Sequence, residues 1–194
     1  MKTKVFIIPG LSDEMRGIGR FIEGGDIITE VFVVGWRKKV QNPRTYFQDR
    51  LGALLAKIDT AHAEGFRVVL IGASAGGSFA VNAFSKREST VAKVINLSGR
   101  LTTEEGFTLV SLEKYKETDP VFMASVEMTE SYISHPTQSL LQNFVAFVPL
   151  WDELVPLKTM GFEGARGRRV IMCEHILNIV SMFTIYRNKL LAEL

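Results

Sequence analysis

The sequence predicts an α/β domain in which about six mostly parallel strands are covered by helices on both faces. Short apolar runs rich in β-branched residues alternate along the chain with amphipathic or alanine-rich segments of helical length. The runs lack a polar residue at every second position, which is typical of strands buried on both faces. With 194 residues, 46% of them hydrophobic, the chain can bury a sizeable core, and we expect one domain over residues 1–194.

Six apolar runs are the predicted strands. They cover residues 5–8, 27–34, 67–71, 91–97, 144–148 and 169–172. Because helices between consecutive strands return the chain to the same end of the sheet, this alternation predicts a largely parallel sheet. In such sheets the functional residues lie in loops at the carboxyl ends of the strands.

Three segments outside the strands are predicted helices. Pro43 suits the first turn of a helix over residues 42–64, in which leucine and isoleucine recur at three- and four-residue spacing. A second helix should cover residues 75–86, and a last one residues 176–191. These helices supply the two outer layers of the predicted fold.

The segment over residues 100–143 is longer than a single crossover helix needs. We expect one part of it to be that helix and the rest to form a small excursion or lid over the upper edge of the sheet. Core packing is the favoured interpretation of its apolar side chains, and a substrate pocket is the alternative. The residues concerned are Phe107, Leu109, Tyr115, Phe122, Met123, Tyr132 and Ile133. The same segment is a candidate homodimer surface.

The most informative motif is G-x-S-x-G, formed by Gly72, Ser74 and Gly76 directly after an apolar run and before an alanine-rich segment. Glycines on either side of the serine allow a strained strand-to-helix turn that leaves the serine exposed as a nucleophile. A dinucleotide-binding loop fits worse, because Ser74 occupies the place of its middle glycine. A phosphate-binding P-loop also fits worse, since its G-K-[ST] ending is missing. Ser74 is therefore the candidate nucleophile.

A serine nucleophile needs a histidine base, and the chain has three histidines. His62 falls inside a predicted helix, where a solvated surface residue is the favoured interpretation. His135 lies in the irregular segment without a strand end to hold it. His175 follows the last predicted strand and precedes the last predicted helix, so it is the candidate base. The alternative for His175 is a helix cap or a buried structural residue.

The base in turn needs a carboxylate that fixes its tautomer. Asp152 and Glu153 follow the fifth predicted strand in a loop bounded by Pro149 and Pro156. Position favours Asp152 as the acid, with Glu153 as its alternative and a solvated acidic pair as the non-functional interpretation. The chain order is then serine, acid, histidine.

The loop after the first predicted strand is expected to complete an oxyanion hole. Leu11, which follows the flexible Gly10, and Ala75, which follows Ser74, are the candidate backbone N–H donors to the charge on a tetrahedral intermediate. Ser12 and Asp13 alternatively cap a helix that starts near residue 14.

With these motifs in order, the chain resembles the α/β-hydrolase superfamily over nearly its whole length. It is most similar to the small, nearly lidless branch typified by retinoblastoma-binding-protein-9-like serine hydrolases. The matching features are Pro9-Gly10 after the first apolar run, the motif over residues 72–76, Asp152 in the segment 152–156, and His175. The resemblance implies a compact hydrolase sheet and esterase-like activity on acyl substrates. Two features depart from larger members, which often have His-Gly at the oxyanion loop and Gly where this chain has Glu174.

Composition narrows the partners and the compartment. The 23 Lys and Arg against 21 Asp and Glu leave a formal charge of +2, too balanced to indicate nucleic acid or an anionic membrane as partner. No stretch approaches the roughly 20 apolar residues of a membrane span. The lone Cys173 cannot form an internal disulfide, and its apolar run predicts a core position. We expect a cytoplasmic protein.

The sequence therefore favours a serine hydrolase that cleaves a small-molecule ester or thioester through an acyl-enzyme, with no metal and no organic cofactor. The alternative is a non-catalytic binding protein on the same fold. The apolar side chains that are candidates for an acyl pocket are Phe107, Phe122, Met123, Trp151 and Phe162. Three arginines at 166, 168 and 169 are candidates for an anionic substrate group, although a solvated surface is the safer interpretation.

Overall fold

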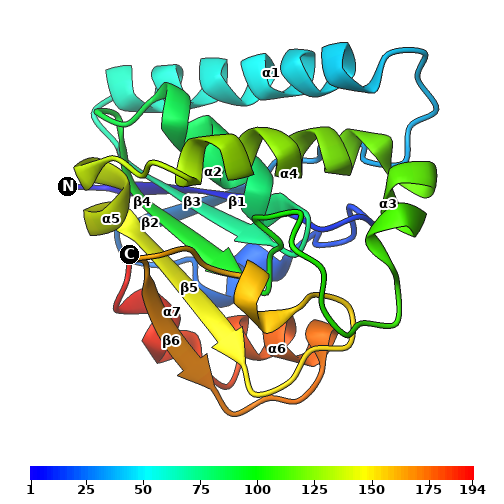
Figure 1. The fold of residues 1–194 in the computed structure, drawn as a ribbon. Helices are drawn as coiled ribbons and strands as arrows, with labels where there is room; N and C mark the ends of the chain where they lie inside the picture. Colours follow the sequence, from blue (N-terminus) through cyan, green and yellow to red (C-terminus); the bar gives the residue numbers. More distant parts are fainter.

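A computed structural model describes residues 1–194 and contains a six-stranded sheet with helices on both faces (Figure 1). The strands are β1 (Thr3–Ile8), β2 (Ile27–Val31), β3 (Arg67–Ala73), β4 (Val91–Leu97), β5 (Phe144–Pro149) and β6 (Arg166–Val170). Their order across the sheet is β2-β1-β3-β4-β5-β6, and every neighbouring pair is parallel. The predicted fold class is confirmed.

The helices form two layers. One layer contains α1 (Pro43–Ala63), α2 (Gly76–Lys86) and α4 (Pro120–Ile133), and the other contains α6 (His175–Phe183), α7 (Arg187–Leu191) and the 3₁₀ turn η1 (Ile18–Phe21) (Figure 1). The short helices α3 (Leu112–Thr118) and α5 (Gln138–Asn143) and the 3₁₀ turn η2 (Leu157–Thr159) lie in the connections. None of the helices combines the length and the apolar character needed to cross a membrane.

Burial of both sheet faces explains why the strands read as continuous apolar runs. In β3, Val68 and Leu70 belong to the core on the α2 side, whereas Val69 and Ile71 belong to the core on the α6 side. All four side chains are fully buried. Successive residues of a strand point to opposite faces, so a central strand of this sheet has no position for a solvated polar residue.

The loops after β1 and β2 differ from the sequence prediction. The strand predicted over residues 27–34 ends at Val31, because the backbone N–H groups of Val34 and Gly35 donate to the Asp13 carboxylate at 3.1 and 3.0 Å. Asp13 itself has a left-handed backbone with φ of 56°, and no α-helix starts near residue 14. Asp13 therefore ties two loops together instead of capping a helix.

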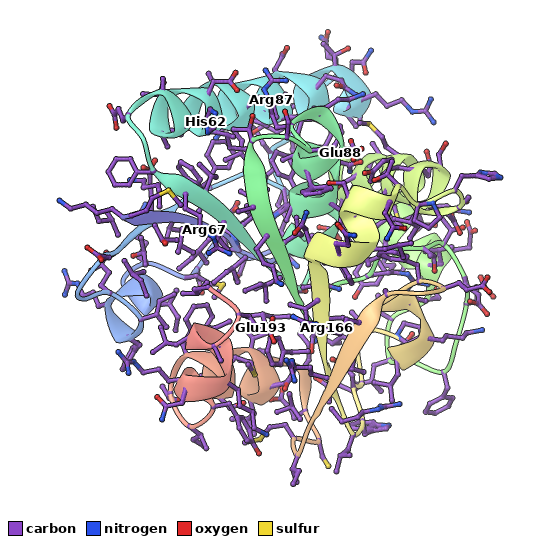
Figure 2. The ribbon with its side chains drawn as sticks, turned by 90° about the vertical axis from the view of Figure 1, so that its left-hand side faces the viewer. His62, Arg67, Arg87, Glu88, Arg166 and Glu193 are labelled. Atoms are coloured by element: carbon purple, nitrogen blue, oxygen red, sulfur yellow. The ribbon has the colours of Figure 1, made fainter.

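The last strand is displaced from the predicted residues 169–172 and spans Arg166–Val170. As an edge strand it pairs only with β5, and its first four residues are exposed, so apolar patterning does not mark it. The Glu193 carboxylate binds Arg166 and lies 2.6 Å from Arg168 Nε, which holds the C-terminal segment against this strand (Figure 2). Two of the three candidate arginines are thus engaged by a buried carboxylate.

The predicted last helix, residues 176–191, is two helices. Thr184 separates α6 from α7 with non-helical backbone angles of −115° and −86°, and the Tyr186 N–H donates to the Ser181 carbonyl instead of continuing the helical pattern. The predicted core position of Cys173 is wrong, because this residue is exposed in the loop between β6 and α6. The apolar run that contains it continues beyond the buried part of the strand.

The segment over residues 100–143 begins with an irregular stretch and continues as α3, α4 and α5. Its helix α4 packs against α1 and α2. Core packing is confirmed for Tyr115, Phe122, Met123 and Ile133, which belong to the larger buried cluster. Phe107 and Leu109 differ, because both lie in the irregular stretch and are exposed.

Candidate active site

Ser74 lies at the turn between β3 and α2, and steric contacts shape this turn. Its backbone φ is 53°, a left-handed conformation that costs about 1–2 kcal/mol for a residue with a side chain. A Cβ on Gly72 would lie 2.3 Å from the Gly76 carbonyl oxygen, and one on Gly76 would lie 2.0 Å from the Ile8 carbonyl oxygen. Both glycines of the motif are therefore required by close backbone packing.

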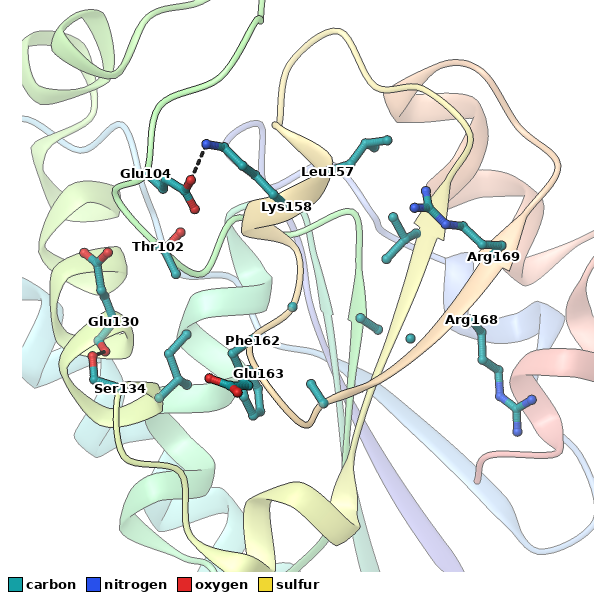
Figure 3. Close-up of a pocket in the computed structure, with 16 residues that line it drawn as sticks. Thr102, Glu104, Glu130, Ser134, Leu157, Lys158, Phe162, Glu163, Arg168 and Arg169 are labelled. Atoms are coloured by element: carbon teal, nitrogen blue, oxygen red, sulfur yellow. Dashed lines mark hydrogen bonds and ion pairs between the residues drawn. The ribbon is translucent and has the colours of Figure 1, made fainter.

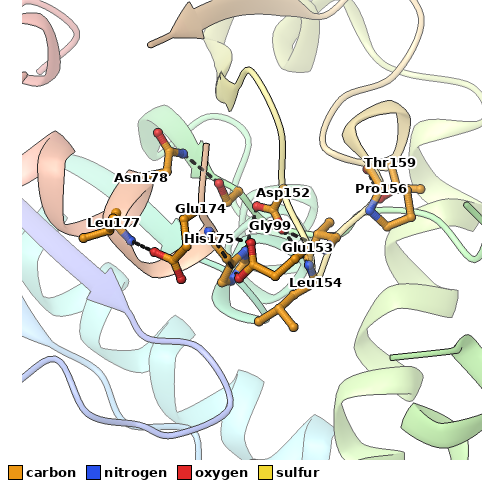
Figure 4. A network of polar contacts seen from close by, with 12 residues as sticks. Gly99, Asp152, Glu153, Leu154, Pro156, Thr159, Glu174, His175, Leu177 and Asn178 are labelled. Carbon is orange, nitrogen blue, oxygen red and sulfur yellow. Dashed lines mark hydrogen bonds and ion pairs between the residues drawn. The ribbon is translucent and has the colours of Figure 1, made fainter. Parts of the chain in front are cut away.

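Asp152, in the loop after β5, and His175, the first residue of α6, are brought together at the carboxyl end of the sheet (Figure 4). Asp152 Oδ2 lies 2.8 Å from His175 Nδ1, and both residues are 3% exposed. The other carboxylate oxygen accepts the N–H groups of Leu154 and Val155 at 3.0 and 2.8 Å. A carboxylate held in this way favours the imidazole tautomer with the proton on Nδ1 and leaves Nε2 as the acceptor.

The third member of the predicted set is not hydrogen-bonded to this pair. His175 Nε2 is buried and has no hydrogen-bond partner, so the Ser74 hydroxyl and the imidazole do not form a hydrogen bond in this structure. The other two histidines, His62 on α1 and His135 after α4, are exposed. Figure 2 shows His62 on α1, in the helix layer that also contains α2 and α4.

The two acidic residues beside the pair have separate structural roles. The Glu153 carboxylate accepts the backbone N–H of His175 at 3.1 Å, so Asp152 and not Glu153 contacts the imidazole. Glu174 is the N-cap of α6, and its side chain accepts the Leu177 N–H at 2.5 Å. Both carboxylates therefore fix the first turn of the helix that begins at His175.

The loop after β1 lies directly against the serine turn. A Cβ on Gly10 would be 2.8 Å from Ser74 Cβ, and the Trp36 indole donates to the Pro9 carbonyl at 3.1 Å. The backbone N–H groups of Leu11 and Ala75 donate to no acceptor in the chain. Two unengaged donors thus belong to the two segments that flank the Ser74 side chain.

A buried polar contact links the α6 layer to the end of β4, and the sequence prediction missed it. Asn178 Nδ2 donates to Ser98 Oγ at 2.7 Å, and both side chains are fully buried. Ser98 also has a left-handed backbone, with φ of 51°. The available signal was a lone Asn three residues after His175 in an otherwise apolar helical run, where i and i+3 share a face.

The loop after β4 is held by a second buried polar group. The Arg100 guanidinium, 2% exposed, donates to the carbonyl oxygens of Thr102 and Glu104 at 3.0 and 2.7 Å. Burial lowers the pKa of this guanidinium from its ordinary value, yet the group stays a cation at neutral pH. Arg100 thus shapes the start of the irregular stretch.

The structure contains a cavity of about 590 Å³ that does not include the Asp152–His175 pair (Figure 3). Its walls come from α4, β5, β6 and the segment around η2, and none of Ser74, Asp152 or His175 lines it. Of the acyl-pocket candidates only Phe162 contributes to it; Phe122 and Met123 are buried in the core. No three His, Cys, Asp or Glu side chains are grouped so that they could hold a metal ion.

Comparisons with known proteins find similarity in structure only. No family model and no curated protein matches the sequence. A 2-hydroxy-6-oxo-6-phenylhexa-2,4-dienoate hydrolase from Rhodococcus sp. strain RHA1 is 11% identical with a TM-score of 0.69, and the match covers 99% of this chain and 90% of that one. A monoacylglycerol lipase from Paleococcus ferrophilus is 12% identical with a TM-score of 0.66, and the match covers 100% of this chain and 97% of that one.

Human thioesterase 2 is similar at 15% identity and a TM-score of 0.56, over 100% of this chain and 96% of that one. The resemblance to the retinoblastoma-binding-protein-9-like branch stays a prediction, because these matches do not distinguish branches. The similarity to the three structures extends over nearly the full length of each protein. The chain therefore has the α/β-hydrolase fold.

Proposed function

We propose that this chain is a serine hydrolase that cleaves an ester or thioester by acyl transfer, with Ser74 as nucleophile, His175 as base and Asp152 as the orienting acid. The observation that carries the proposal is the left-handed backbone of Ser74 between two tightly packed glycines. Strain of this kind persists where the surroundings enforce it, and it concentrates at functional sites. Asp13 and Ser98 also have left-handed backbones, but only Ser74 has a glycine two residues to either side, and both glycines are required by close backbone packing.

In the first half-reaction, Ser74 Oγ attacks the substrate carbonyl while its proton passes to His175 Nε2. The Asp152 carboxylate, 2.8 Å from Nδ1, stabilises the imidazolium that forms. Substrate entry would bring the hydroxyl and the imidazole into hydrogen-bond contact, since catalytic hydrogen bonds often tighten only in the complex. The buried and unpartnered Nε2 supports this role.

The tetrahedral intermediate carries its negative charge on the former carbonyl oxygen. The unengaged N–H groups of Leu11 and Ala75 are the proposed donors to that oxygen. Collapse of the intermediate expels the alcohol or thiol, which takes the proton from His175. Water, deprotonated by the same imidazole, then attacks the acyl-enzyme and releases the carboxylic acid and free Ser74.

The substrate class is proposed from the names of similar structures. The names of two similar structures, a lipase and a thioesterase, are compatible with acyl esters and thioesters. The whole chain, 1–194, would act as one domain. A non-catalytic binding protein is the competing proposal, and the exposed Phe107 and Leu109 of that stretch are the observation in its favour.

A hydrolysis assay separates the two proposals. The purified protein and its Ser74→Ala variant would be given p-nitrophenyl esters and acyl-thioesters of increasing chain length. The proposal expects hydrolysis by the wild type and loss of essentially all of it in the variant, with circular dichroism showing that both are folded. Equal hydrolysis by both proteins would remove Ser74 from the mechanism. No hydrolysis of any ester by the folded wild type would favour the binding protein.

A further inference from the structure

Arg100, in the loop after β4, is a buried cation without a carboxylate partner. It is 2% exposed, and its guanidinium donates only to the carbonyl oxygens of Thr102 and Glu104. Burial lowers its pKa, and although the charges of Glu105 and Glu130 act against this, neither carboxylate forms an ion pair with it. Buried charges are normally paired, because an unpaired one loses its hydration without compensation. The missing partner of Arg100 is therefore a feature to be explained.

Arg100 and Tyr115 both have hydrogen-bond donors that nothing in the chain engages. These are the two N–H groups on Arg100 Nη1 and the hydroxyl of Tyr115, a residue that is 8% exposed. Neither Nη1 nor the phenol oxygen is fully shielded from solvent. Burial raises the pKa of Tyr115, the Arg100 cation opposes this, and the Asp119 and Asp152 carboxylates add to it. The phenol hydroxyl thus lies among these three charges, one of which belongs to the candidate active site.

The backbone before Arg100 lies directly against the serine turn. A Cβ on Gly99 would be 2.6 Å from the Ser74 carbonyl oxygen. Gly99 is also held by the buried Asn96 side chain, which accepts its N–H at 3.1 Å and donates to its carbonyl at 2.9 Å. Arg100 therefore starts from a fixed point beside the candidate nucleophile.

Tyr115 is connected to the loop after β1 through two aromatic contacts. It packs edge-to-face against Phe122 with ring centroids 5.5 Å apart, and Phe122 packs in the same way against Trp36 at 6.1 Å. The Trp36 indole donates to the Pro9 carbonyl, next to the glycine that contacts Ser74. Contacts from Tyr115 and from Arg100 thus both lead to the serine turn, so their unengaged donors lie beside the candidate site.

The charges around these donors match a single carboxylate. Asp119 is already paired with Arg37, at 3.3 Å, and Asp152 is paired with His175, so Arg100 is the one cation left over. An uncharged ligand would leave this buried cation unpaired. A doubly charged phosphate would exceed its charge and be repelled by the two aspartates. A carboxylate supplies one negative charge and two oxygens, one for the guanidinium and one for the phenol.

We propose that Arg100 and Tyr115 bind a carboxylate carried by the substrate, so that the preferred ester or thioester is a monoanion. The inference rests on the proposed function and names the substrate class of the same site. Arg100 Nη1 donates to one carboxylate oxygen and the Tyr115 hydroxyl to the other. The shared chemistry is the carboxylate, whether the acyl group or the leaving group carries it, and the experiment separates these two sources.

Binding to the Ser74→Ala variant tests the subsite without turnover. Calorimetric titrations would compare the mono-p-nitrophenyl ester of adipic acid with p-nitrophenyl hexanoate, and 4-carboxyphenyl hexanoate with phenyl hexanoate. In one of the two pairs the carboxylate ester should bind about ten-fold more tightly or better, and Arg100→Gln in the same background should abolish this preference. Arg87→Gln is the matched control, because Arg87 pairs with Asp59 at the far end of α2, and it should keep the preference (Figure 2).

Tyr115→Phe is the variant that keeps the packing, since Arg100 also holds two backbone carbonyls. Phenylalanine retains the contact with Phe122 and removes only the hydroxyl. The ratio of kcat/KM for the carboxylate ester to that for its uncharged counterpart should fall about three- to ten-fold, through KM. Tyr132→Phe is its control and should leave the ratio unchanged, because the Tyr132 hydroxyl donates to Glu88.

Two results would overturn the proposal. One is equal affinity of Ser74→Ala for the charged and uncharged members of both pairs. The other is an equal loss on both members of a pair in Arg100→Gln and Tyr115→Phe, which would make the two residues structural only. Preferential binding of a carboxylate ester that the folded wild type does not hydrolyse contradicts only the catalytic role. Hydrolysis of charged and uncharged esters with equal kcat/KM contradicts only the subsite.

Discussion

The Ser74 turn and the segments that carry Asp152 and His175 meet at one end of the sheet but are held in different ways. The serine turn is fixed by backbone contacts, since Gly72, Gly76 and Gly10 each leave no room for a Cβ. The acid and the base are fixed by hydrogen bonds, from Asp152 to two backbone N–H groups and to His175 Nδ1. Exclusion of side-chain volume thus positions the nucleophile, whereas polar contacts position its partners.

This difference has a consequence for what each region tolerates. Adding a single carbon atom to one of these glycines creates a steric clash, so the substitution mainly destabilises the folded state. A hydrogen-bonded arrangement can lose one partner and keep its fold, so the damage is to chemistry. Changes at the glycines of the serine turn should therefore act mainly on stability, and changes at the acid and the base mainly on rate.

The largest effect is expected for Asp152→Asn. The amide cannot hold the imidazole proton on Nδ1 as the carboxylate does, and in a serine protease triad the same change lowers kcat by about ten-thousand-fold. We expect a comparable loss in kcat with a folded protein. Glu153→Gln is the matched control, because Glu153 contacts only the His175 backbone, and it should cost less than about ten-fold. Equal losses in both variants would contradict the assignment of Asp152.

Gly76→Ala should have the next largest effect, and it should act on stability. Its Cβ would lie 2.0 Å from the Ile8 carbonyl oxygen and 2.9 Å from that of Pro9, both backbone atoms that cannot move alone. We expect destabilisation of about 3 kcal/mol or more, measured by urea denaturation. Gly52→Ala on α1, where an added Cβ meets nothing within 4 Å, is the control and should not destabilise.

Asn178→Ala should have a smaller effect and should act on rate. The change removes the 2.7 Å bond to Ser98 that anchors the first turns of α6, and with it the orientation of His175. We expect kcat to fall by about ten-fold while KM for a short ester changes little. A fall in unfolding free energy with unchanged kcat would make Asn178 a structural residue only.

The smallest expected effect on stability is the gain from Ser74→Gly. Glycine adopts a φ of 53° without strain, so the free energy of unfolding should rise by about 1 kcal/mol while activity is lost. Urea denaturation of this variant and of Ser74→Ala measures the difference, since alanine keeps the strain. Equal stabilities would mean that the serine turn stores no strain, against the steric side of the comparison.

The sequence predicted most accurately those strands and helices whose burial produces a clear apolar pattern. The run at 91–97 and the helix opened by Pro43 are found at almost the predicted bounds, because a central strand and an amphipathic helix have periodic signatures. The predicted bounds of the edge strand β6 were wrong, because its residues pair with β5 through the backbone and its exposed arginines give no apolar pattern. The role of Asp13 and the Asn178–Ser98 contact depend on residues far apart in the chain, and no local pattern encodes them.

The candidate site was predictable only as separate parts. The G-x-S-x-G motif identified the serine turn from local packing, and the strand ends located Asp152 and His175 at the same edge of the sheet. Position in the sequence favoured Asp152 over Glu153 as the acid, and the side-chain directions in the structure agree, because Asp152 contacts the imidazole and Glu153 the His175 backbone.

Labelling with a fluorophosphonate probe, followed by intact-mass measurement, tests the central claim most directly. Such probes modify only a serine that is activated as a nucleophile. We predict a single adduct on the wild type, mapped to Ser74 by peptide analysis, and none on Ser74→Ala. A folded wild type that takes up no probe, or an adduct that persists in Ser74→Ala, would contradict the assignment of Ser74 as the nucleophile.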